Sequence, residues 1–261
     1  MLENHRRAIE RLVAELEDDP RFVAVLLAGS IARGAERPDS DVDLILIASD
    51  EEYARRLPTR DFGYLNREVC DYPGGYAEAK VVPLSYLEEV AERGAEPARA
   101  AFVGATVLCS RVPGVEEMVE RARAYPEAER DAKLRSFWAQ ILIQYWYISE
   151  AERLADRYLL LRSVSEFVLF VARLILTHNR VLFPYHKWLT WELRRTPEKP
   201  DDLVEALERL LAEPALANAN PVLSSVMSFR DWEQPPLGPS AQFMEDSEWH
   251  WRRGPAPVAD R

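Results

Sequence analysis

The spacing of apolar residues along the first 110 positions switches between the spacing of helices and that of strands. Apolar residues three and four positions apart predict amphipathic helices, whereas short apolar runs between turn-forming residues predict strands. The expected helices cover residues 5–16, 50–57 and 84–93. The expected strands cover residues 22–28, 42–47, 76–82 and 106–109. Strands and helices in this order indicate a domain in which helices pack on a β-sheet.

The pattern becomes helical almost throughout after Pro113. Two long apolar stripes have the spacing of one helix face each. They consist of Leu134, Phe137, Trp138, Ile141, Leu142 and Tyr145, and of Phe167, Phe170, Val171, Leu174 and Ile175. We therefore expect two domains: a β-sheet domain at residues 1–112 and a C-terminal helical bundle at residues 113–261 that ends in a Trp-rich tail.

The composition is that of an ordinary globular protein, with 48% hydrophobic and 30% charged residues among 261. The formal net charge is −11, from 44 acidic and 33 basic residues. This charge argues against a protein that binds nucleic acid through its phosphates, which needs a basic surface. It favours a cationic small substrate only weakly, because an acidic surface also keeps a protein soluble.

The first residues are charged, and no apolar core of signal-peptide length follows them. No later stretch approaches the roughly 20 apolar residues of a membrane span. The two cysteines, Cys70 and Cys109, do not have the spacing of a metal site, and they fit buried thiols in a reducing compartment. We therefore expect a cytoplasmic protein.

The candidate chemistry lies between two of the predicted strands. Gly29-Ser30 follows the first strand, where a residue without a side chain lets the backbone approach an anion closely and a helix start offers free N–H groups. Ten residues later, Asp41 and Asp43 alternate with Val42, so both carboxylates point to one face of the next strand. A divalent cation would relieve their mutual repulsion, and Mg²⁺ characteristically joins one or two carboxylates to substrate phosphates.

This arrangement resembles the nucleotidyltransferases of the DNA polymerase beta superfamily, whose signature is an apolar strand, Gly-Ser, a spacer and Asp-x-Asp on the next strand. The longer string that runs from Gly29 to Gly34, with Ser40 before Asp41, is similar to small bacterial members, including those that adenylylate antibiotics. The resemblance implies an α+β fold with a mixed β-sheet, followed by the helical bundle. It also implies that Asp41 and Asp43 are catalytic metal ligands. It further implies nucleotide contacts at Gly29, Ser30 and Ser40. Arg33, four residues beyond Gly29, is a further candidate for a phosphate contact, but a solvated charge over the helix start explains it equally well.

The family normally has a third carboxylate on a later strand, and Glu78 is the candidate for it. Many relatives carry aspartate there, so the role of Glu78 stays open between a metal ligand and the base that deprotonates the acceptor hydroxyl. The alternative is an exposed strand residue that pairs with Lys80 or a nearby arginine.

Residues 178–195 resemble an Asn-Arg…Pro-x-x-Lys-Trp segment of the helical domain of bacterial small-molecule nucleotidyltransferases. The resemblance implies that Lys187 contacts nucleotide phosphates. The alternative is a surface lysine at a helix start. Arg173 and His178 have the Arg-x-x-x-x-His spacing of HEPN ribonucleases, but such a two-residue pattern often arises by chance, and a buried or capping histidine explains His178 better.

The function implied by the resemblance is transfer of a nucleoside monophosphate, most often AMP from ATP, to an acceptor hydroxyl with release of pyrophosphate. Two Mg²⁺ ions on Asp41, Asp43 and Glu78 would be the cofactors, and the acceptor would be a small hydroxylated molecule such as an aminoglycoside or a lincosamide antibiotic. The alternatives are a protein-adenylylating enzyme of toxin–antitoxin type, an RNA nucleotidyltransferase and a silent nucleotide-binding module. We expect no membrane partner, and a homodimer is left open because some relatives share a site between two chains.

Overall fold

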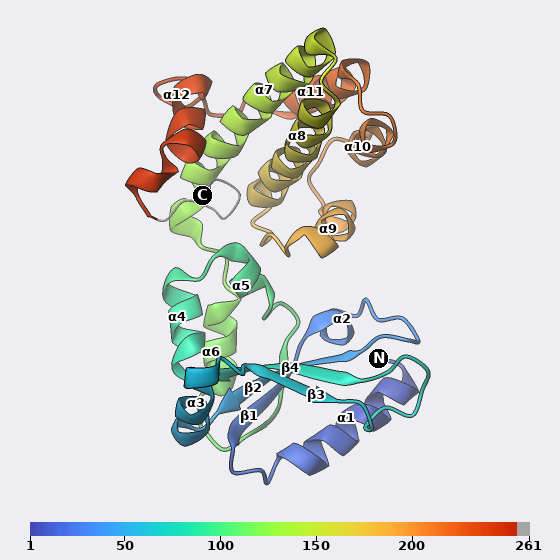
Figure 1. The fold of residues 1–261 in the computed structure, drawn as a ribbon, viewed down its shortest axis with the longest axis vertical. Helices are drawn as coiled ribbons and strands as arrows, with labels where there is room; N and C mark the ends of the chain where they lie inside the picture. The colour runs from blue at the N-terminus through green and yellow to red at the C-terminus, as the bar shows by residue number, and fades with distance from the viewer. Residues whose placement is uncertain (255–261) are drawn as a thin grey trace. The chain divides into compact units, whose positions relative to one another are not determined.

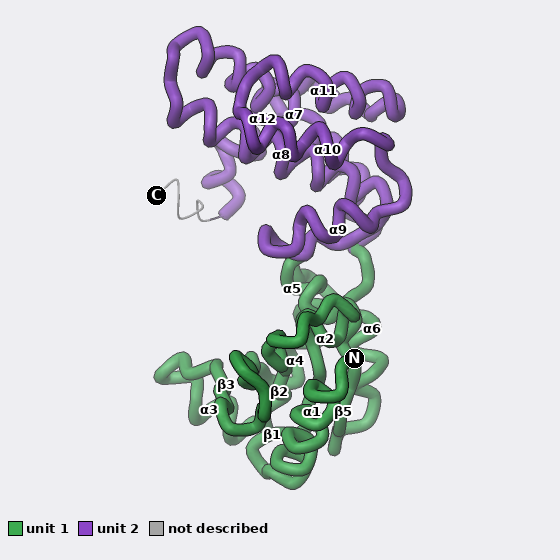
Figure 2. The backbone as a smooth tube through the Cα atoms, turned by 90° about the vertical axis from the view of Figure 1, so that its right-hand side faces the viewer, with its two compact units in different colours: residues 1–125 green, residues 126–261 purple. Residues whose placement is uncertain are grey.

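The computed structural model describes residues 1–254, and the chain divides into two compact units, Met1–Tyr125 and Pro126–Arg261 (Figure 2). The sequence predicted a division after residue 112, whereas the two units meet after Tyr125. The predicted domains, with their roles in chemistry and in substrate binding, stay a prediction. Within the described residues, none of the helices is both long and apolar enough to cross a membrane.

Unit 1 is built on a five-stranded sheet with the strand order β3-β4-β2-β1-β5 (Figure 1). Strands β2 and β4 run parallel, whereas the other neighbouring pairs are antiparallel, so the sheet is mixed. The strands are β1 (Phe22–Leu27), β2 (Val42–Ala48), β3 (Gly63–Asn66), β4 (Ala77–Pro83) and β5 (Thr106–Ser110).

Helices cover both faces of this sheet. Helix α1 buries its apolar stripe against one face, which presents alternate residues such as Leu44 and Leu46 of β2. Helices α4 and α6 pack on the opposite face, where Ile45 and Ile47 of the same strand lie. Because both faces are buried, β2 is a nearly continuous apolar run. The helices of unit 1 are α1 (Glu3–Leu16), α2 (Gly29–Ala32), α3 (Asp50–Arg56), α4 (Ser85–Arg93), α5 (Glu96–Ala100) and α6 (Val115–Ala122).

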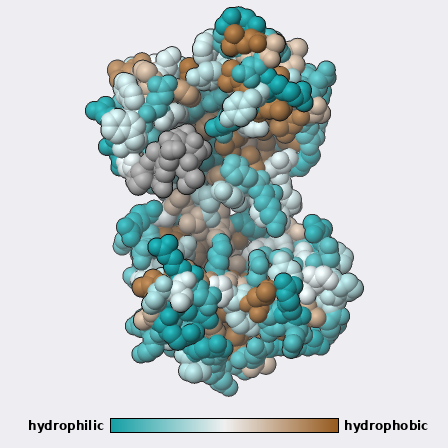
Figure 3. All heavy atoms as spheres, in the orientation of Figure 1, coloured by the Kyte–Doolittle hydropathy of each residue, from teal (hydrophilic) through white to brown (hydrophobic). Residues whose placement is uncertain are grey.

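Unit 2 is entirely helical in its described part (Figure 1). Helices α7 and α8 pack along each other and bury the two predicted apolar stripes, and α11 and α12 pack on α7. On the face seen in Figure 3, hydrophobic side chains gather over part of unit 2, whereas unit 1 shows a mostly hydrophilic surface. The helices are α7 (Arg130–Leu154), α8 (Arg157–His178), α9 (Leu189–Arg195), α10 (Leu203–Ala212), α11 (Leu216–Phe229) and α12 (Pro239–Phe243).

The predicted α+β fold is confirmed, with a mixed sheet followed by a helical region. Each strand expected from an apolar run corresponds to an observed strand, with ends that agree to within about two residues, as element boundaries do in general. The pattern missed β3, an edge strand whose four residues are exposed or half-buried. A strand that buries little apolar surface leaves no apolar run to detect.

Candidate active site

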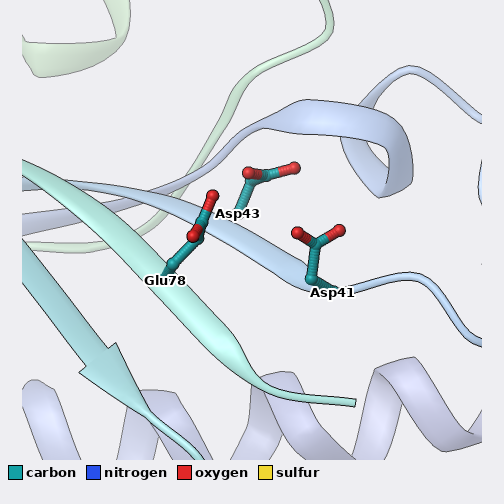
Figure 4. Close-up of side chains that lie close together, drawn as sticks. All are labelled: Asp41, Asp43 and Glu78. Atoms are coloured by element: carbon teal, nitrogen blue, oxygen red, sulfur yellow. The ribbon is translucent and has the colours of Figure 1, made fainter. Parts of the chain in front are cut away.

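Three carboxylates from two neighbouring strands come together at one end of the sheet in unit 1. Asp41 precedes β2, Asp43 lies within it, and Glu78 lies on β4 (Figure 4). The parallel pairing of β2 with β4 sets Asp43 directly beside Glu78. One oxygen from each of the three residues lies within 4.8 Å of the others. The sequence-predicted carboxylates therefore form one cluster.

The donor set of this cluster fits a divalent cation of the Mg²⁺ type. Carboxylate oxygens are the ligands that hard cations prefer, and three negative charges so close together repel one another unless a cation lies between them. Asp41 and Asp43 are half-buried and Glu78 is exposed, so the cluster opens to solvent on the side of Glu78. A cation bound to all three would still have coordination positions free for a substrate.

Gly29 lies against this cluster at the start of α2, the single helical turn that follows β1. Its φ is +66°, a conformation that favours glycine. A Cβ at this position would lie 1.7 Å from Oδ2 of Asp43, which no side chain permits. The backbone of the preceding residue is tied to the same strand, because the N–H of Ala28 donates to the carbonyl oxygen of Asp43 over 2.9 Å. Glycine is therefore required where the turn after β1 passes Asp43.

Ser30, the second residue of the turn, has a buried hydroxyl oxygen without a hydrogen-bond partner among the described residues. A buried hydroxyl without a partner is costly, and most such groups in proteins find one. A phosphate oxygen beside the turn would supply that partner. The observation fits the predicted nucleotide contact of Ser30, which stays a prediction.

Tyr76 belongs to the cluster although sequence reasoning gave it no role. The N–H of Val42 donates to the carbonyl oxygen of Tyr76, which sets Tyr76 beside Asp41 at the ends of β4 and β2. A hydrogen bond to Asp41, together with the negative charges of Asp41, Glu78 and Asp43, raises the pKa of the Tyr76 hydroxyl. The guanidinium of Arg67 lies 5.7 Å from the centre of the Tyr76 ring. Tyr76 therefore lies at the edge of the cluster, beside Asp41.

Arg33 and Ser40, two residues predicted to contact the nucleotide, form hydrogen bonds within unit 1. The guanidinium of Arg33 donates to the carbonyl oxygen of Ala100 at the end of α5. The hydroxyl of Ser40 accepts from the N–H of Arg37 over 2.9 Å, and the carbonyl oxygen of Ser40 accepts from the hydroxyl of Tyr72 over 2.8 Å. Ser40 is thus part of the turn that leads into Asp41, and the nucleotide contacts of both residues stay predictions.

Lys187 belongs to unit 2, where it is exposed in the short turn His186–Trp188 before α9. Its ammonium nitrogen lies 6.0 Å from the centre of the Trp188 ring. The position is that of a side chain free to reach outward, which is compatible both with a phosphate contact and with a surface lysine. The predicted role of Lys187 stays a prediction.

The Arg173 and His178 pair is engaged in packing within unit 2. The guanidinium of Arg173 lies between the rings of Phe137 and Phe183, 4.5 and 4.4 Å from their centres. The imidazole of His178 is hydrogen-bonded to Glu198 over 2.9 Å, and its ring meets hydrophobic neighbours edge-on. These contacts agree with a structural histidine at the end of α8.

The geometry agrees with comparisons to known proteins. Residues 9–99 match the model of the nucleotidyltransferase domain, and this range contains the turn of Gly29 and all three carboxylates. A solved structure of a nucleotidyltransferase-like protein from Exiguobacterium sibiricum 255-15 is similar to the chain, with 14% identity and a TM-score of 0.48 over 95% of this chain and 79% of that one. Among curated proteins, none matches the chain. Residues 9–99 therefore form a nucleotidyltransferase domain, the family that the sequence pattern predicted for this part of the chain.

Proposed function

We propose that this protein transfers a nucleoside monophosphate, AMP from ATP, to a hydroxyl group of a small molecule and releases pyrophosphate. The observation that carries the proposal is the convergence of Asp41, Asp43 and Glu78 within 4.8 Å beside the turn of Gly29. A nucleotidyltransferase domain implies a nucleoside triphosphate as substrate, and the carboxylate cluster supplies the donor set for its metal. The choice of ATP rests on the resemblance to small bacterial members.

The transfer makes one bond and breaks one. The acceptor oxygen attacks the α-phosphorus, an O–P bond forms, and the bond from the α-phosphorus to the oxygen that bridges to the β-phosphorus breaks. The pair of electrons leaves with pyrophosphate, and the hydroxyl proton passes to a base. Two Mg²⁺ ions on the carboxylates would neutralise the charge that develops on the attacking and leaving oxygens.

The protein's own groups then have distinct tasks. Asp41 and Asp43 would hold the metal, and we assign Tyr76, which lies beside Asp41, the task of positioning its carboxylate. Gly29 and Ser30 leave room for the departing phosphates, with Arg33, Ser40 and Lys187 as further nucleotide contacts. Glu78 is the exposed member of the cluster, so we place it next to the acceptor. There it serves as a metal ligand or as the base that takes the hydroxyl proton.

The proposed acceptor is a small molecule with free hydroxyl groups, of which aminoglycosides and lincosamides are the first classes to test. A net charge of −11 argues against an RNA acceptor, because RNA binding needs basic surface. In this proposal the sheet domain at residues 1–112 carries the chemistry. We assign the helical region at residues 113–261 a role in binding the nucleotide and the acceptor, and we place the reaction in the cytoplasm, where ATP is available.

The experiment that tests the proposal measures pyrophosphate release from ATP and Mg²⁺ against a panel of aminoglycosides and lincosamides. The wild type is compared with Asp43→Asn and with Asp18→Asn, a matched change at an exposed aspartate away from the cluster. We expect acceptor-dependent release that Asp43→Asn abolishes and Asp18→Asn leaves unchanged. Label transferred from ATP to RNA or to a protein instead would contradict the small-molecule acceptor, and release that survives Asp43→Asn would contradict the active site.

A further inference from the structure

A cavity of about 270 Å³ opens on the same face of the sheet as the three carboxylates. Ile45 of β2 and Lys80 and Val82 of β4 form its floor. These residues continue the alternation that starts at Asp43 and Glu78, since Ile45 pairs with Lys80 one step further along the two strands. Residues two apart on one strand face are separated by about 7 Å. The cavity therefore begins one side chain beyond the carboxylate cluster.

The walls of the cavity suit a ring. Tyr86 of α4 and Phe102 stand with their ring centres 6.4 Å apart, and Ala98 of α5 closes another side with a small methyl group. A cavity of about 150 Å³ holds benzene, so this one has room for a substituted ring. Burial raises the pKa of the Tyr86 hydroxyl, which therefore keeps its proton as a hydrogen-bond donor.

Lys80 gives the cavity its charge preference. Its side chain is exposed, and it makes no hydrogen bond or ion pair with any described residue. Cations bound to the cluster would neutralise its carboxylates. The ammonium group of Lys80, the charged group in the cavity lining, would then set the electrostatic preference for a ligand in the cavity. It attracts an anionic group and repels a cationic one.

The place of the cavity beside the carboxylate cluster suits the acceptor. The attacking and leaving oxygens of a phosphoryl transfer lie roughly in line on opposite sides of the phosphorus. The turn that carries Gly29 lies against Asp43, and our proposed function sets the leaving pyrophosphate beside that turn. The cavity continues from Asp43 and Glu78 along both strands of the same sheet face, so a ring held in it can present a hydroxyl group to the cluster.

We propose that this cavity, lined by Lys80, Tyr86, Ala98 and Phe102, binds the ring of the acceptor and selects a neutral or anionic molecule over a polycation. The inference rests on the proposed function and narrows its substrate class. It disfavours aminoglycosides, whose several ammonium groups Lys80 would repel, relative to acceptors that combine an apolar ring with a hydroxyl group.

The test uses three probes with one hydroxyphenyl ring and different charges: 4-hydroxyphenylacetate, the neutral alcohol tyrosol, and tyramine. Binding to the full chain is followed through the methyl NMR signals of Ala98 and Ala101, both of which line the cavity, with Mg²⁺ and α,β-methylene-ATP present. We expect the carboxylate probe to shift these signals with a Kd about tenfold below that of tyramine. Lys80→Gln should remove this preference while the ring still binds.

A second variant tests the cavity itself. Ala98→Trp fills it and should weaken the carboxylate probe by about tenfold or more. The matched control is Ala95→Trp, at an exposed residue just before α5, which should bind the probe like the wild type. Circular dichroism checks that both variants fold.

Failure of the inference differs from failure of the proposed function. Binding of α,β-methylene-ATP that needs Mg²⁺ and is lost in Asp43→Asn supports the proposed function, whatever the probes do. The inference is overturned if no probe shifts the alanine signals at millimolar concentration, or if tyramine binds most tightly. It is also overturned if Ala98→Trp weakens the nucleotide analogue as much as the probe, because the cavity would then hold the nucleoside.

Discussion

Gly29 and Asp43 touch so closely that the structure leaves no space for a side chain between them. A Cβ on Gly29 would lie 1.7 Å from Oδ2 of Asp43 and 2.4 Å from its Cγ. The contact joins the turn after β1 to the metal-binding strand β2. Any side chain at position 29 must therefore push a candidate metal ligand out of the cluster.

The first prediction compares two glycines with the same backbone conformation. Gly29 and Gly34 both have a φ of +66°, but a Cβ on Gly34 would meet nothing within 4 Å. Gly34→Ala should cost about 1–2 kcal/mol of stability from its left-handed conformation alone. Gly29→Ala should carry the same cost and in addition lower activity by about 100-fold, since a ligand misplaced by about 1 Å has that effect.

Urea unfolding and pyrophosphate release measure the two effects separately. Gly34→Ala serves as the control for backbone strain. Equal activity in the two variants would show that the enzyme tolerates displacement of Asp43. The close contact between Gly29 and Asp43 would then not affect catalysis.

The second prediction concerns metal binding by the three carboxylates. A ligand that binds only the folded protein stabilises it, by about 2.7 kcal/mol at 100 times its Kd. Mg²⁺ should therefore raise the Tm of the wild type, and EDTA should reverse the rise. Asp41→Asn, Asp43→Asn and Glu78→Gln should each shrink this Mg²⁺-dependent shift, because each removes a ligand of the cluster.

Asp18→Asn is the control for metal binding, and its Tm should respond to Mg²⁺ like that of the wild type. A Tm response that persists in all three cluster variants would mean that Mg²⁺ binds elsewhere. Calorimetric titration with Mn²⁺ provides an independent measure of the same loss.

The carboxylate cluster could be predicted because its parts are local in sequence. Asp41 and Asp43 lie two residues apart on a strand that its apolar pattern reveals, so their common face follows from the alternation of side chains. The position of Glu78 was expected from the family pattern. That it lies directly beside Asp43 depends on the parallel register of β2 and β4, which connects residues 35 positions apart in the chain.

Features that depend on long-range packing could not be predicted. The place of Tyr76 beside Asp41 depends on the same register, and an isolated tyrosine before a strand gives no local signal for it. The cavity beside Lys80 needs α4 and α5 to pack over the sheet, and the pattern did not predict α5, which has only five residues. Helix α6 was expected in the helical region, but its buried residues Val115 and Val119 pack on the sheet of unit 1.

The third prediction concerns Tyr76 as a positioning residue. Tyr76→Phe removes the hydroxyl that bonds to Asp41 and should cost about 0.5–1.5 kcal/mol of interaction, since this is the usual net value of one hydrogen bond. We expect kcat to fall by about 2- to 13-fold and the Kd for Mn²⁺ to rise, with KM for ATP unchanged. The raised pKa of Tyr76 keeps its hydroxyl protonated at neutral pH, so the loss should not vary between pH 6 and 8.

Tyr64→Phe is the matched control, because the Tyr64 hydroxyl bonds to Glu15, which is not part of the carboxylate cluster. This variant should keep the activity and Mn²⁺ affinity of the wild type. A Tyr76→Phe enzyme with unchanged Mn²⁺ affinity would show that Asp41 needs no support from Tyr76.

The last prediction concerns acid stability and a buried ion pair on α3. Hydrogen bonds from Arg55 and Arg56 lower the pKa of Glu52 to about 2, although burial opposes the shift. The Glu52 side chain is 5% exposed, and its oxygens accept from Nε of Arg55 over 2.8 Å and from Nε of Arg56 over 2.6 Å. Because the folded pKa lies below the unfolded value of about 4.5, the ionised pair stabilises the folded state above pH 4.5. This stabilisation is lost as the pH falls toward 2.

We therefore expect Glu52→Gln to be less stable than the wild type at neutral pH by at most about 3 kcal/mol, the limit set by linkage for a shift of this size. The difference should shrink steadily between pH 4.5 and pH 2, as measured by urea unfolding at several pH values. Glu51→Gln, at the exposed neighbouring glutamate, should show no such narrowing. A difference that stays constant down to pH 2 would mean that the substitution disturbs packing and that the charge of Glu52 contributes nothing.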